Sequence, residues 1–255
     1  MYITMDSQTL GAHYQCHKNP TSFLRTIKSF QTHYPENYIH VINDGGYDYS
    51  EFCMTRGIKY TYFEKSNNSR GAHCFSNRTS AIEFLLKLWN FINFIPATHF
   101  ILLEDDVRVL RHHTVPFYYS INGCNFNEFL PPSMQKILTE NGYSGKFFYG
   151  AYGGTVLFTS FFKGIEFPSI IQLLNKLPDV FECDYGSDML LSFITLYFGG
   201  TIGDHPEIAE TWYKNINTLI NENKVSFLHQ FKSDYDSYGE KMSPYEKKEL
   251  MWNIN

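Results

Sequence analysis

The sequence predicts an α/β protein in which helices flank a mainly parallel central sheet within a single domain. Three observations support this class. Short apolar segments alternate with helical patterns through the first half of the chain, which is typical of βαβ units. The length of 255 residues suits one α/β domain with a sizeable core. The sequence also contains no internal repeat and no low-complexity tract.

Two helices and four strands are predicted in the first half. A first-turn proline and apolar residues at helical spacing predict a helix from Pro20 to about His33. An apolar face predicts a second helix from about Ser76 to Phe94, which Pro96 ends. Alternating or continuous apolar residues predict strands at 13–18, 38–43, 58–63 and 99–103.

The second half is less regular. Residues 122–145 are polar and rich in turn-forming residues, which predicts a long loop. Strand-like segments occur within 147–162, and 187–198 predicts a buried helix with Ser187 or Asp188 at its start. The adjacent pair His112 and His113 is not expected to bind a metal, because neighbouring residues of a strand face opposite ways. Both are expected at the surface.

Charge and hydropathy exclude several classes of protein. The net charge of −5 gives no overall field that would attract nucleic acid. The most apolar stretch, 84–103, has too many polar interruptions to span a membrane. The N-terminal residues lack the pattern of a signal peptide, and the five cysteines have no CxxC spacing. We therefore expect a soluble, cytoplasmic protein with reduced thiols.

Three adjacent carboxylates, Glu104, Asp105 and Asp106, follow the predicted central strand directly. Ligands of open α/β sheets bind outside the carboxyl ends of the strands, where this triplet would lie. Ionised carboxylates need a counter-charge, and oxygen ligands suit Mg²⁺ or Mn²⁺, which often share their coordination with substrate phosphates. The triplet therefore indicates a divalent cation site, although a solvated acidic loop is the alternative.

Several further motifs follow in order along the chain. The stronger ones are HYQCHKNP, HVINDGG, Arg70-Gly71 with Asn77-Arg78, and FILLEDDV, and the weaker ones are AYGGTVLF, YGSDMLLSF and FLHQFK. Together they resemble the nucleotide-sugar glycosyltransferases of the GT-A fold, particularly the family-two-like group with an EDD version of the DxD motif. The resemblance implies a Rossmann-like GT-A domain over 1–255, with a nucleotide-binding half (12–110), an acceptor and catalytic half (111–232) and a peripheral tail (233–255).

The resemblance also implies an activity and its partners. The enzyme would act in glycan biosynthesis and move a hexose or pentose from a UDP or GDP sugar to a glycan or protein hydroxyl. Asp106 would ligate the metal, while Glu104 and Asp105 would lie near the ribose and donor sugar. A histidine far along the chain often completes such a site, and His229 is the first choice, with His205 in reserve. An imidazole ligand favours Mn²⁺ over Mg²⁺.

Other donor contacts follow from the same resemblance. Asp44, the acid after the second strand, would contact the base or ribose, and Gly45 and Gly46 would allow close backbone approach there. His17 would lie beside the base, and Arg78 would suit the phosphates. Gly153 and Gly154 would line the donor sugar. In the plain structural alternatives, these residues form turns, a strand bulge or a solvated helix end. The residues concerned are His17, Asp44, Gly45, Gly46, Arg78, Gly153 and Gly154.

Transfer with inversion at the sugar needs a base that removes the acceptor proton. Asp188, at the start of a predicted helix, has the right chemical type, and Asp184 competes with it for the role. Two other functions stay open at the level of sequence. A nucleotidyltransferase or metal phosphohydrolase would use the same acidic cluster, and a catalytically silent subunit would bind the donor without turnover.

Overall fold

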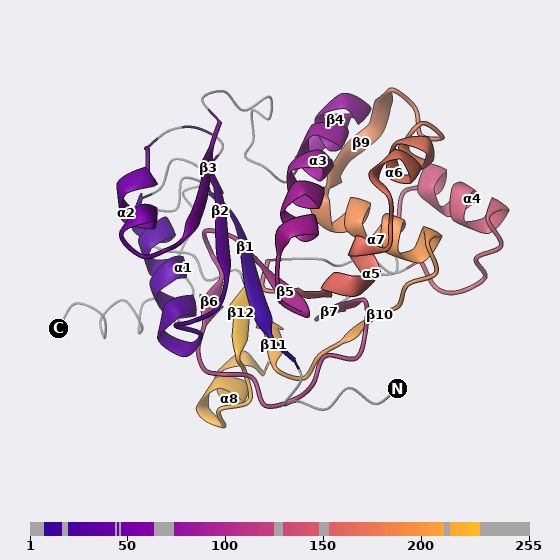
Figure 1. Ribbon diagram of the computed structural model, residues 1–255. Helices are drawn as coiled ribbons and strands as arrows, with labels where there is room; N and C mark the ends of the chain where they lie inside the picture. Colours follow the sequence, from indigo (N-terminus) through magenta and orange to yellow (C-terminus); the bar gives the residue numbers. More distant parts are fainter. Residues whose placement is uncertain are drawn as a thin grey trace.

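A seven-stranded sheet lies at the centre of the computed structural model (Figure 1). The structure describes residues 8–16, 20–43, 45, 47–63, 74–124, 130–147, 153–211 and 215–229, and for 20, 21, 74 and 182–184 it describes the backbone alone. Within these residues the strand order is β10-β7-β8-β5-β1-β2-β3. The strands are β1 (Leu10–Cys16), β2 (Ile39–Asn43), β3 (Lys59–Tyr62), β5 (His99–Leu103), β7 (Ile121–Gly123), β8 (Val156–Phe158) and β10 (Ile202–Asp204).

Neighbouring strands of this sheet pair in parallel, except that β8 is antiparallel to both β5 and β7. The mainly parallel sheet of the sequence prediction is therefore confirmed. Because β5, β1, β2 and β3 run in one direction, their carboxyl ends meet at one edge of the sheet. The acidic triplet leaves the sheet at this edge.

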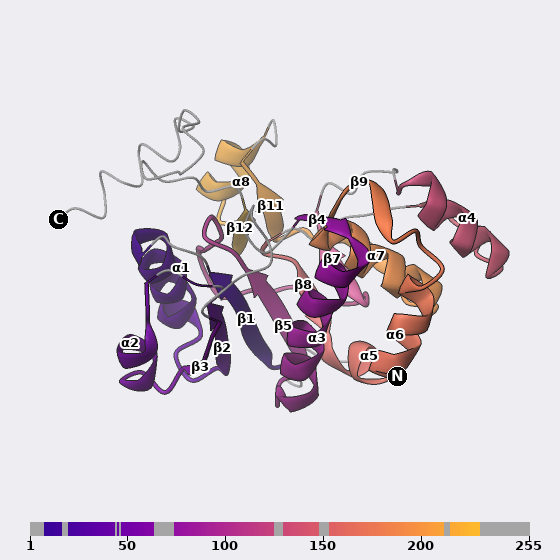
Figure 2. The same ribbon diagram turned by 90° about the horizontal axis from the view of Figure 1, so that it is seen from above.

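Helices cover both faces of the sheet (Figures 1 and 2). Helices α1 and α2 lie on one side, and α3, α5, α6 and α7 lie on the other. The helices are α1 (Pro20–His33), α2 (Ser50–Met54), α3 (Arg78–Phe94), α4 (Pro132–Glu140), α5 (Thr159–Lys163), α6 (Phe167–Leu174), α7 (Ser187–Tyr197) and α8 (Ile216–Asn221).

Strand β5 joins the two layers of the core because its side chains alternate between them. Ile101 and Leu103 pack in the cluster that contains α1, whereas Phe100 and Leu102 pack in the cluster that contains α3 and α7. All five residues of β5 are buried. Its continuous apolar sequence therefore reflects helices on both faces, as in parallel sheets generally.

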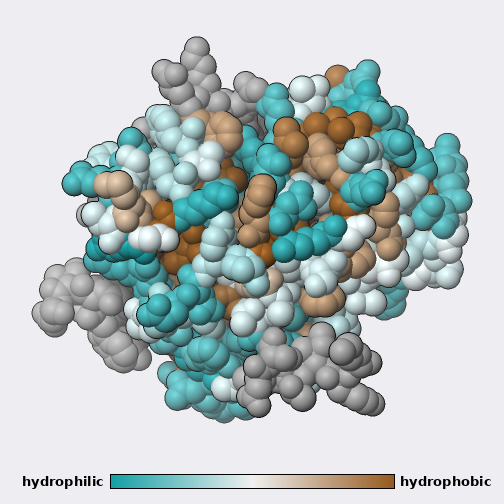
Figure 3. Space-filling model, in the orientation of Figure 1, coloured by the Kyte–Doolittle hydropathy of each residue, from teal (hydrophilic) through white to brown (hydrophobic). Residues whose placement is uncertain are grey.

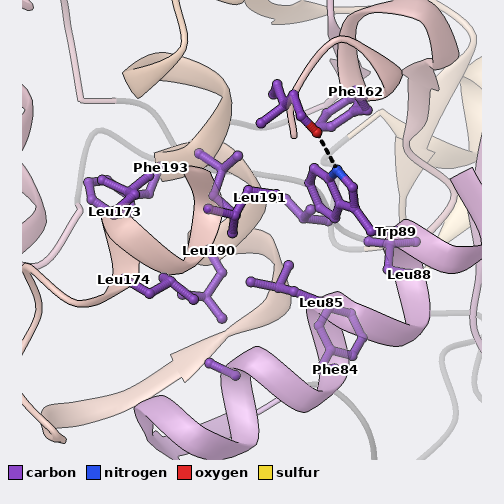
Figure 4. Packing of buried hydrophobic residues seen from close by; sticks show 14 of the residues in the cluster. Phe84, Leu85, Leu88, Trp89, Phe162, Leu173, Leu174, Leu190, Leu191 and Phe193 are labelled. Atoms are coloured by element: carbon purple, nitrogen blue, oxygen red, sulfur yellow. Dashed lines mark hydrogen bonds between the residues drawn. The ribbon is translucent and has the colours of Figure 1, made fainter. Parts of the chain in front are cut away.

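The larger cluster brings together buried residues of α3, α5, α6 and α7 (Figure 4). Leu85, Leu88 and Trp89 of α3 point toward Leu190 and Leu191 of α7. The indole of Trp89 donates a 3.0 Å hydrogen bond to the backbone carbonyl of Ile165, so its polar atom is satisfied inside the core.

Two small sheets complete the described part of the fold. In one, β12 (Phe227–His229) lies between β11 (Ile208–Glu210) and β6 (Arg108–Val109), parallel to the first and antiparallel to the second. In the other, β4 (Cys74–Asn77) pairs with β9 (Val180–Gly186) in antiparallel fashion. The first of these sheets brings the last described strand beside the residues that follow the acidic triplet.

The prediction of one long loop over 122–145 is wrong, because α4 forms within it. Pro132 lies in the first turn of α4, where a proline needs no hydrogen-bonded N–H. Met134, Ile137 and Leu138 then form a buried stripe at helical spacing. The proline pair therefore marks the start of a helix in this segment.

The surface is a mosaic of hydrophilic and hydrophobic residues on the face shown in Figure 3. Elsewhere in the described residues, irrespective of this view, the large exposed apolar side chains include Met54 and Phe94, which come from different helices. Among the described residues, no helix has both the length and the hydropathy needed to cross a membrane.

Candidate metal centre

The acidic triplet forms a tight turn that other elements hold in place. The backbone N–H of Val107 donates to the carbonyl oxygen of Glu104 at 3.1 Å, which closes the turn. The hydroxyl of Thr26, buried in α1, lies 3.2 to 3.3 Å from three backbone carbonyl oxygens of the segment 104–107. Arg108 in turn donates to the Thr26 hydroxyl at 2.8 Å and to the Val107 carbonyl at 2.6 Å. The turn is thus fixed to α1.

Asp105 has a different partner from the other two acids. Its Oδ1 accepts a 2.5 Å hydrogen bond from the hydroxyl of Tyr14, on the neighbouring strand β1. Burial, and then the charge of Asp105, raise the pKa of Tyr14 well above its usual value. The phenol therefore keeps its proton and acts as the donor to Asp105.

Glu104 and Asp106 meet a histidine from the far end of the chain. Glu104, Asp106 and His229 each offer one ligand atom, and these atoms lie within 4.8 Å of one another. Nε2 of His229 is 3.5 Å from Oδ1 of Asp106 and 3.8 Å from Oε2 of Glu104. Two oxygen ligands and one imidazole suit Mn²⁺ better than Mg²⁺.

The charges of this cluster are strongly interdependent. Burial and the charge of Glu104 raise the pKa of Asp106, while His229 opposes the shift. For His229, burial acts to lower the pKa, but the nearby carboxylates outweigh it and hold the pKa well above its usual value. Without a metal ion, the imidazole is therefore protonated on both nitrogens and positively charged near neutral pH. A metal ion would replace the proton on Nε2 and leave the one on Nδ1.

Gly153 lies against two members of the cluster. A β-carbon added there would meet Cδ2 of His229 at 2.9 Å and the carboxyl carbon of Glu104 at 3.0 Å. Such distances are too short for ordinary contact, so a residue without a side chain is required for this packing. The next residue, Gly154, has a φ of 82°, a conformation that favours glycine.

The structure does not bring the reserve histidine, His205, into this cluster. Its Nε2 donates to the backbone carbonyl of Val115 at 3.1 Å, and its Nδ1 accepts from the backbone N–H of Glu207 at 3.3 Å. Both ring nitrogens are therefore occupied within the protein. Of the two histidines that the sequence analysis selected, His229 is the one beside Asp106.

Asp188 lies in the first turn of α7 and is also outside the cluster. Its Oδ1 accepts a 2.9 Å hydrogen bond from the backbone N–H of Met189. A β-carbon at Gly186, the residue that caps the helix, would collide with the same carboxylate. The helix cap is therefore Gly186, and its lack of a side chain leaves room for Asp188.

Arg78 makes contacts that stabilise the fold. Its guanidinium donates to the backbone carbonyls of Asn175 and Leu177, at 3.3 and 3.0 Å, and pairs with Asp179. These contacts fasten the start of α3 to the segment before β9. They give the residue a structural role that the sequence did not indicate, and contact with a phosphate stays a prediction.

Several predicted donor residues fall outside the described part of the protein. His17, Asp44 and Gly46 are among them, and for Asp184 only the backbone is described. Gly45 is described, is buried and has a φ of 101°, so its backbone adopts a conformation that favours glycine.

The surface location expected for both His112 and His113 is wrong for the second residue. His113 is buried, its Nδ1 lies 2.7 Å from the hydroxyl of Tyr34, and its ring packs against Phe117. The two imidazoles stack on each other with centroids 5.0 Å apart. The two residues do not belong to a strand, so the alternation of strand side chains does not apply to them.

The residues that support the cluster were not predicted from the sequence. Tyr14, Thr26 and Arg108 hold the acidic turn, and Glu210 contacts His229 from the neighbouring strand. Glu210 is the last residue of the three-residue strand β11, which is too short to show a period in the sequence. The others join segments that are far apart in the sequence, so no local pattern marks them.

The fold is similar to that of solved glycosyltransferases. Galactosyltransferase LgtC, in complex with donor and acceptor sugar analogues, matches 86% of each chain with a TM-score of 0.53 and 14% identity. An active-site mutant of LgtC matches with a TM-score of 0.56 and 14% identity, over 96% of this chain and 95% of the other. The glycosyltransferase GlyE of Streptococcus pneumoniae TIGR4 matches with a TM-score of 0.52 and 10% identity, over 98% of this chain and 61% of its own.

No protein-family model matches the sequence, and no curated protein matches it at the level of sequence. At identities of 10 to 14%, the structural likeness establishes the fold. The GT-A fold expected from the motifs is therefore confirmed. The narrower resemblance to the family-two-like group, and the reading of Glu104 to Asp106 as a DxD variant, stay predictions.

Proposed function

We propose that this protein is a metal-dependent glycosyltransferase that moves a sugar from a nucleoside diphosphate sugar, UDP- or GDP-linked, to a hydroxyl group of a glycan or protein. The observation that carries this proposal is the grouping of Glu104, Asp106 and His229 at the carboxyl end of β5. Open α/β sheets bind ligands at this edge. The likeness of the fold to LgtC and GlyE adds support.

The three ligands would hold Mn²⁺, or less favourably Mg²⁺. When bound, the cation would offset the charge of the diphosphate and act as a Lewis acid toward the departing nucleotide. Asp106 and Glu104 supply negative oxygens, and His229 supplies the nitrogen that favours manganese. Gly153 keeps their packing free of any further side chain.

Calorimetry with UDP, GDP and CMP sugars, with and without Mn²⁺, tests the proposal. We expect metal-dependent binding of one donor by the wild-type protein and loss of that binding in Asp106→Ala. Glu140→Gln is a suitable control because Glu140 is an exposed carboxylate at the end of α4. Equal donor binding by Asp106→Ala and wild type would remove the cluster from the mechanism. Turnover of nucleoside triphosphates or phosphoesters, without sugar transfer, would favour the other enzyme classes.

We assign the role of general base to Asp188, with inversion at the transferred sugar. The start of a helix stabilises an ionised carboxylate, which keeps Asp188 available as a proton acceptor. Asp188→Asn should keep donor affinity but lose at least ~100-fold in transfer rate, as is typical when a general base is removed. Normal transfer by this variant would shift the role to Asp184.

The configuration of the product tests inversion separately. An anomeric proton spectrum of the first product should show the configuration opposite to that of the donor. Retention of configuration would contradict the assignment of a base, and it would leave the metal site and the donor class in place.

A further inference from the structure

We propose that Glu210 positions His229 for metal binding, an inference that rests on the proposed metal-dependent function. The two residues are register partners in the parallel pair β11 and β12. Oε1 of Glu210 lies 3.0 Å from Nδ1 of His229. The Glu210 side chain is fully buried, and that of His229 is 5% exposed. The contact therefore joins two buried side chains on neighbouring strands of the small sheet.

This hydrogen bond gives the two imidazole nitrogens of His229 different roles. A carboxylate acceptor holds the proton on Nδ1, so that a neutral ring presents the lone pair of Nε2. Nε2 is the atom that faces Asp106 and Glu104, at 3.5 and 3.8 Å. Glu210 thus selects both the tautomer and the ring orientation that a metal ligand requires.

The backbone and one glycine limit other orientations of the ring. The backbone N–H of Thr211, the residue after Glu210, donates to the carbonyl oxygen of His229 at 3.3 Å, which extends the pairing of the strands. Gly153 packs against the Cδ2 edge of the imidazole. On the opposite edge of the small sheet, β6 leads directly from the acidic turn.

A second observation separates Glu210 from an ordinary buried carboxylate. Its other oxygen, Oε2, is buried and has no hydrogen-bond partner among the described residues. Burying a carboxylate in this way is costly unless it is paired, and His229 is the partner that the structure provides.

Glu207, three residues earlier, shows what a structural carboxylate looks like in the same region. Both of its oxygens are used, by the guanidinium of Arg111 at 2.5 Å, by the backbone N–H and hydroxyl of Thr114, and by the backbone N–H of Val115. These contacts tie down the segment 111–115 and do not reach the cluster. Glu207 is therefore the matched control for Glu210.

The test is a titration of the full chain with Mn²⁺, followed by electron paramagnetic resonance of the free ion, alone and with UDP or GDP. We expect Glu210→Ala to weaken Mn²⁺ affinity by roughly 10- to 100-fold, the usual effect of removing such an outer partner. Glu210→Gln keeps the shape and an acceptor oxygen, so it should fold and lose less affinity. Glu207→Gln should lower the melting temperature and keep the wild-type affinity for Mn²⁺.

The outcomes separate this inference from the function on which it rests. Unchanged Mn²⁺ affinity in both Glu210 variants would overturn the positioning role and leave the proposed function standing. A loss of affinity in Glu207→Gln equal to that in Glu210→Ala would also overturn it, because general destabilisation would then explain the effect. If the wild-type protein binds no Mn²⁺, either alone or in the presence of UDP or GDP, the metal-dependent function itself is overturned.

Discussion

Gly153 shows how a single missing side chain shapes the cluster of Glu104, Asp106 and His229. Its α-carbon is so close to His229 and Glu104 that a methyl group would displace one of them. We expect Gly153→Ala to weaken Mn²⁺ binding by at least about tenfold, because metal ligands depend on correct placement. Mn²⁺ titration with thermal melting measures this.

Gly164→Ala is the control for this change. Gly164 has a φ of −71° at the end of α5, and the nearest atom to an added β-carbon would be 3.3 Å away. An alanine there contacts only backbone of α5 and none of the three clustered side chains, so Mn²⁺ affinity should stay at the wild-type value whatever the effect on stability. Normal Mn²⁺ binding by Gly153→Ala would show that the cluster tolerates displacement, contrary to our expectation.

Some residues in and around the cluster could be predicted from the sequence, and others could not. The acidic triplet was identifiable as a cation site because it directly follows an apolar strand. The resemblance assigned the metal to Asp106 and placed Glu104 near the ribose and donor sugar, whereas the structure groups Glu104 with Asp106. His229 came from a resemblance, since nothing in its local pattern separates it from the other nine histidines of the chain. Tyr14 and Glu210 were not predicted, because each acts through a partner that only the folded chain brings near.

At the scale of elements, α3 carries the largest contribution to one core layer. Leu85 is fully buried opposite α7 (Figure 4). We expect Leu85→Ala to lower the free energy of unfolding by about 2 to 5 kcal/mol, through lost burial and the cavity left behind. Urea denaturation followed by circular dichroism measures the change.

The neighbouring residue of the same helix is the matched control. Leu86 is 46% exposed, so Leu86→Ala should change the free energy of unfolding by no more than about 0.5 kcal/mol. Similar losses in the two variants would contradict the packing described here for α3.

Elements with strong local signals were predicted well. The helix α1 and the strand β5 have the predicted limits, because a first-turn proline or a continuous apolar run marks them. Strands β11 and β12 were not predicted, since three residues are too few to show a period. Short strands form where neighbouring segments pair with them, which is information that a local pattern lacks.

At the scale of the whole molecule, buried histidines make stability depend on pH. Burial lowers the pKa of His40, His99 and His113 to about 4. In the unfolded chain these groups titrate near pH 6.5. Between these values the unfolded chain binds protons that the folded protein does not, so the free energy of unfolding falls as the pH falls. Each histidine contributes up to about 1.4 kcal/mol per pH unit.

His99→Phe isolates one of these contributions. The His99 ring packs between Phe117 and Phe158, with centroids 5.3 and 5.2 Å away, so a phenyl ring suits the space. Urea unfolding at a series of pH values should give a slope shallower than wild type by about 1.4 kcal/mol per pH unit in this window. Above the window, the two proteins should respond to pH alike. Parallel curves throughout would show that His99 takes up protons in the folded state.

The small sheet β11-β12-β6 has a consequence for the order of events during synthesis. A ribosome makes Glu104 and Asp106 well before it makes His229, which belongs to the last described strand. Until that strand docks, the nascent chain holds two neighbouring carboxylates without the imidazole that offsets their repulsion. A nascent chain that ends before β12 therefore carries the acids of the site but cannot yet assemble it.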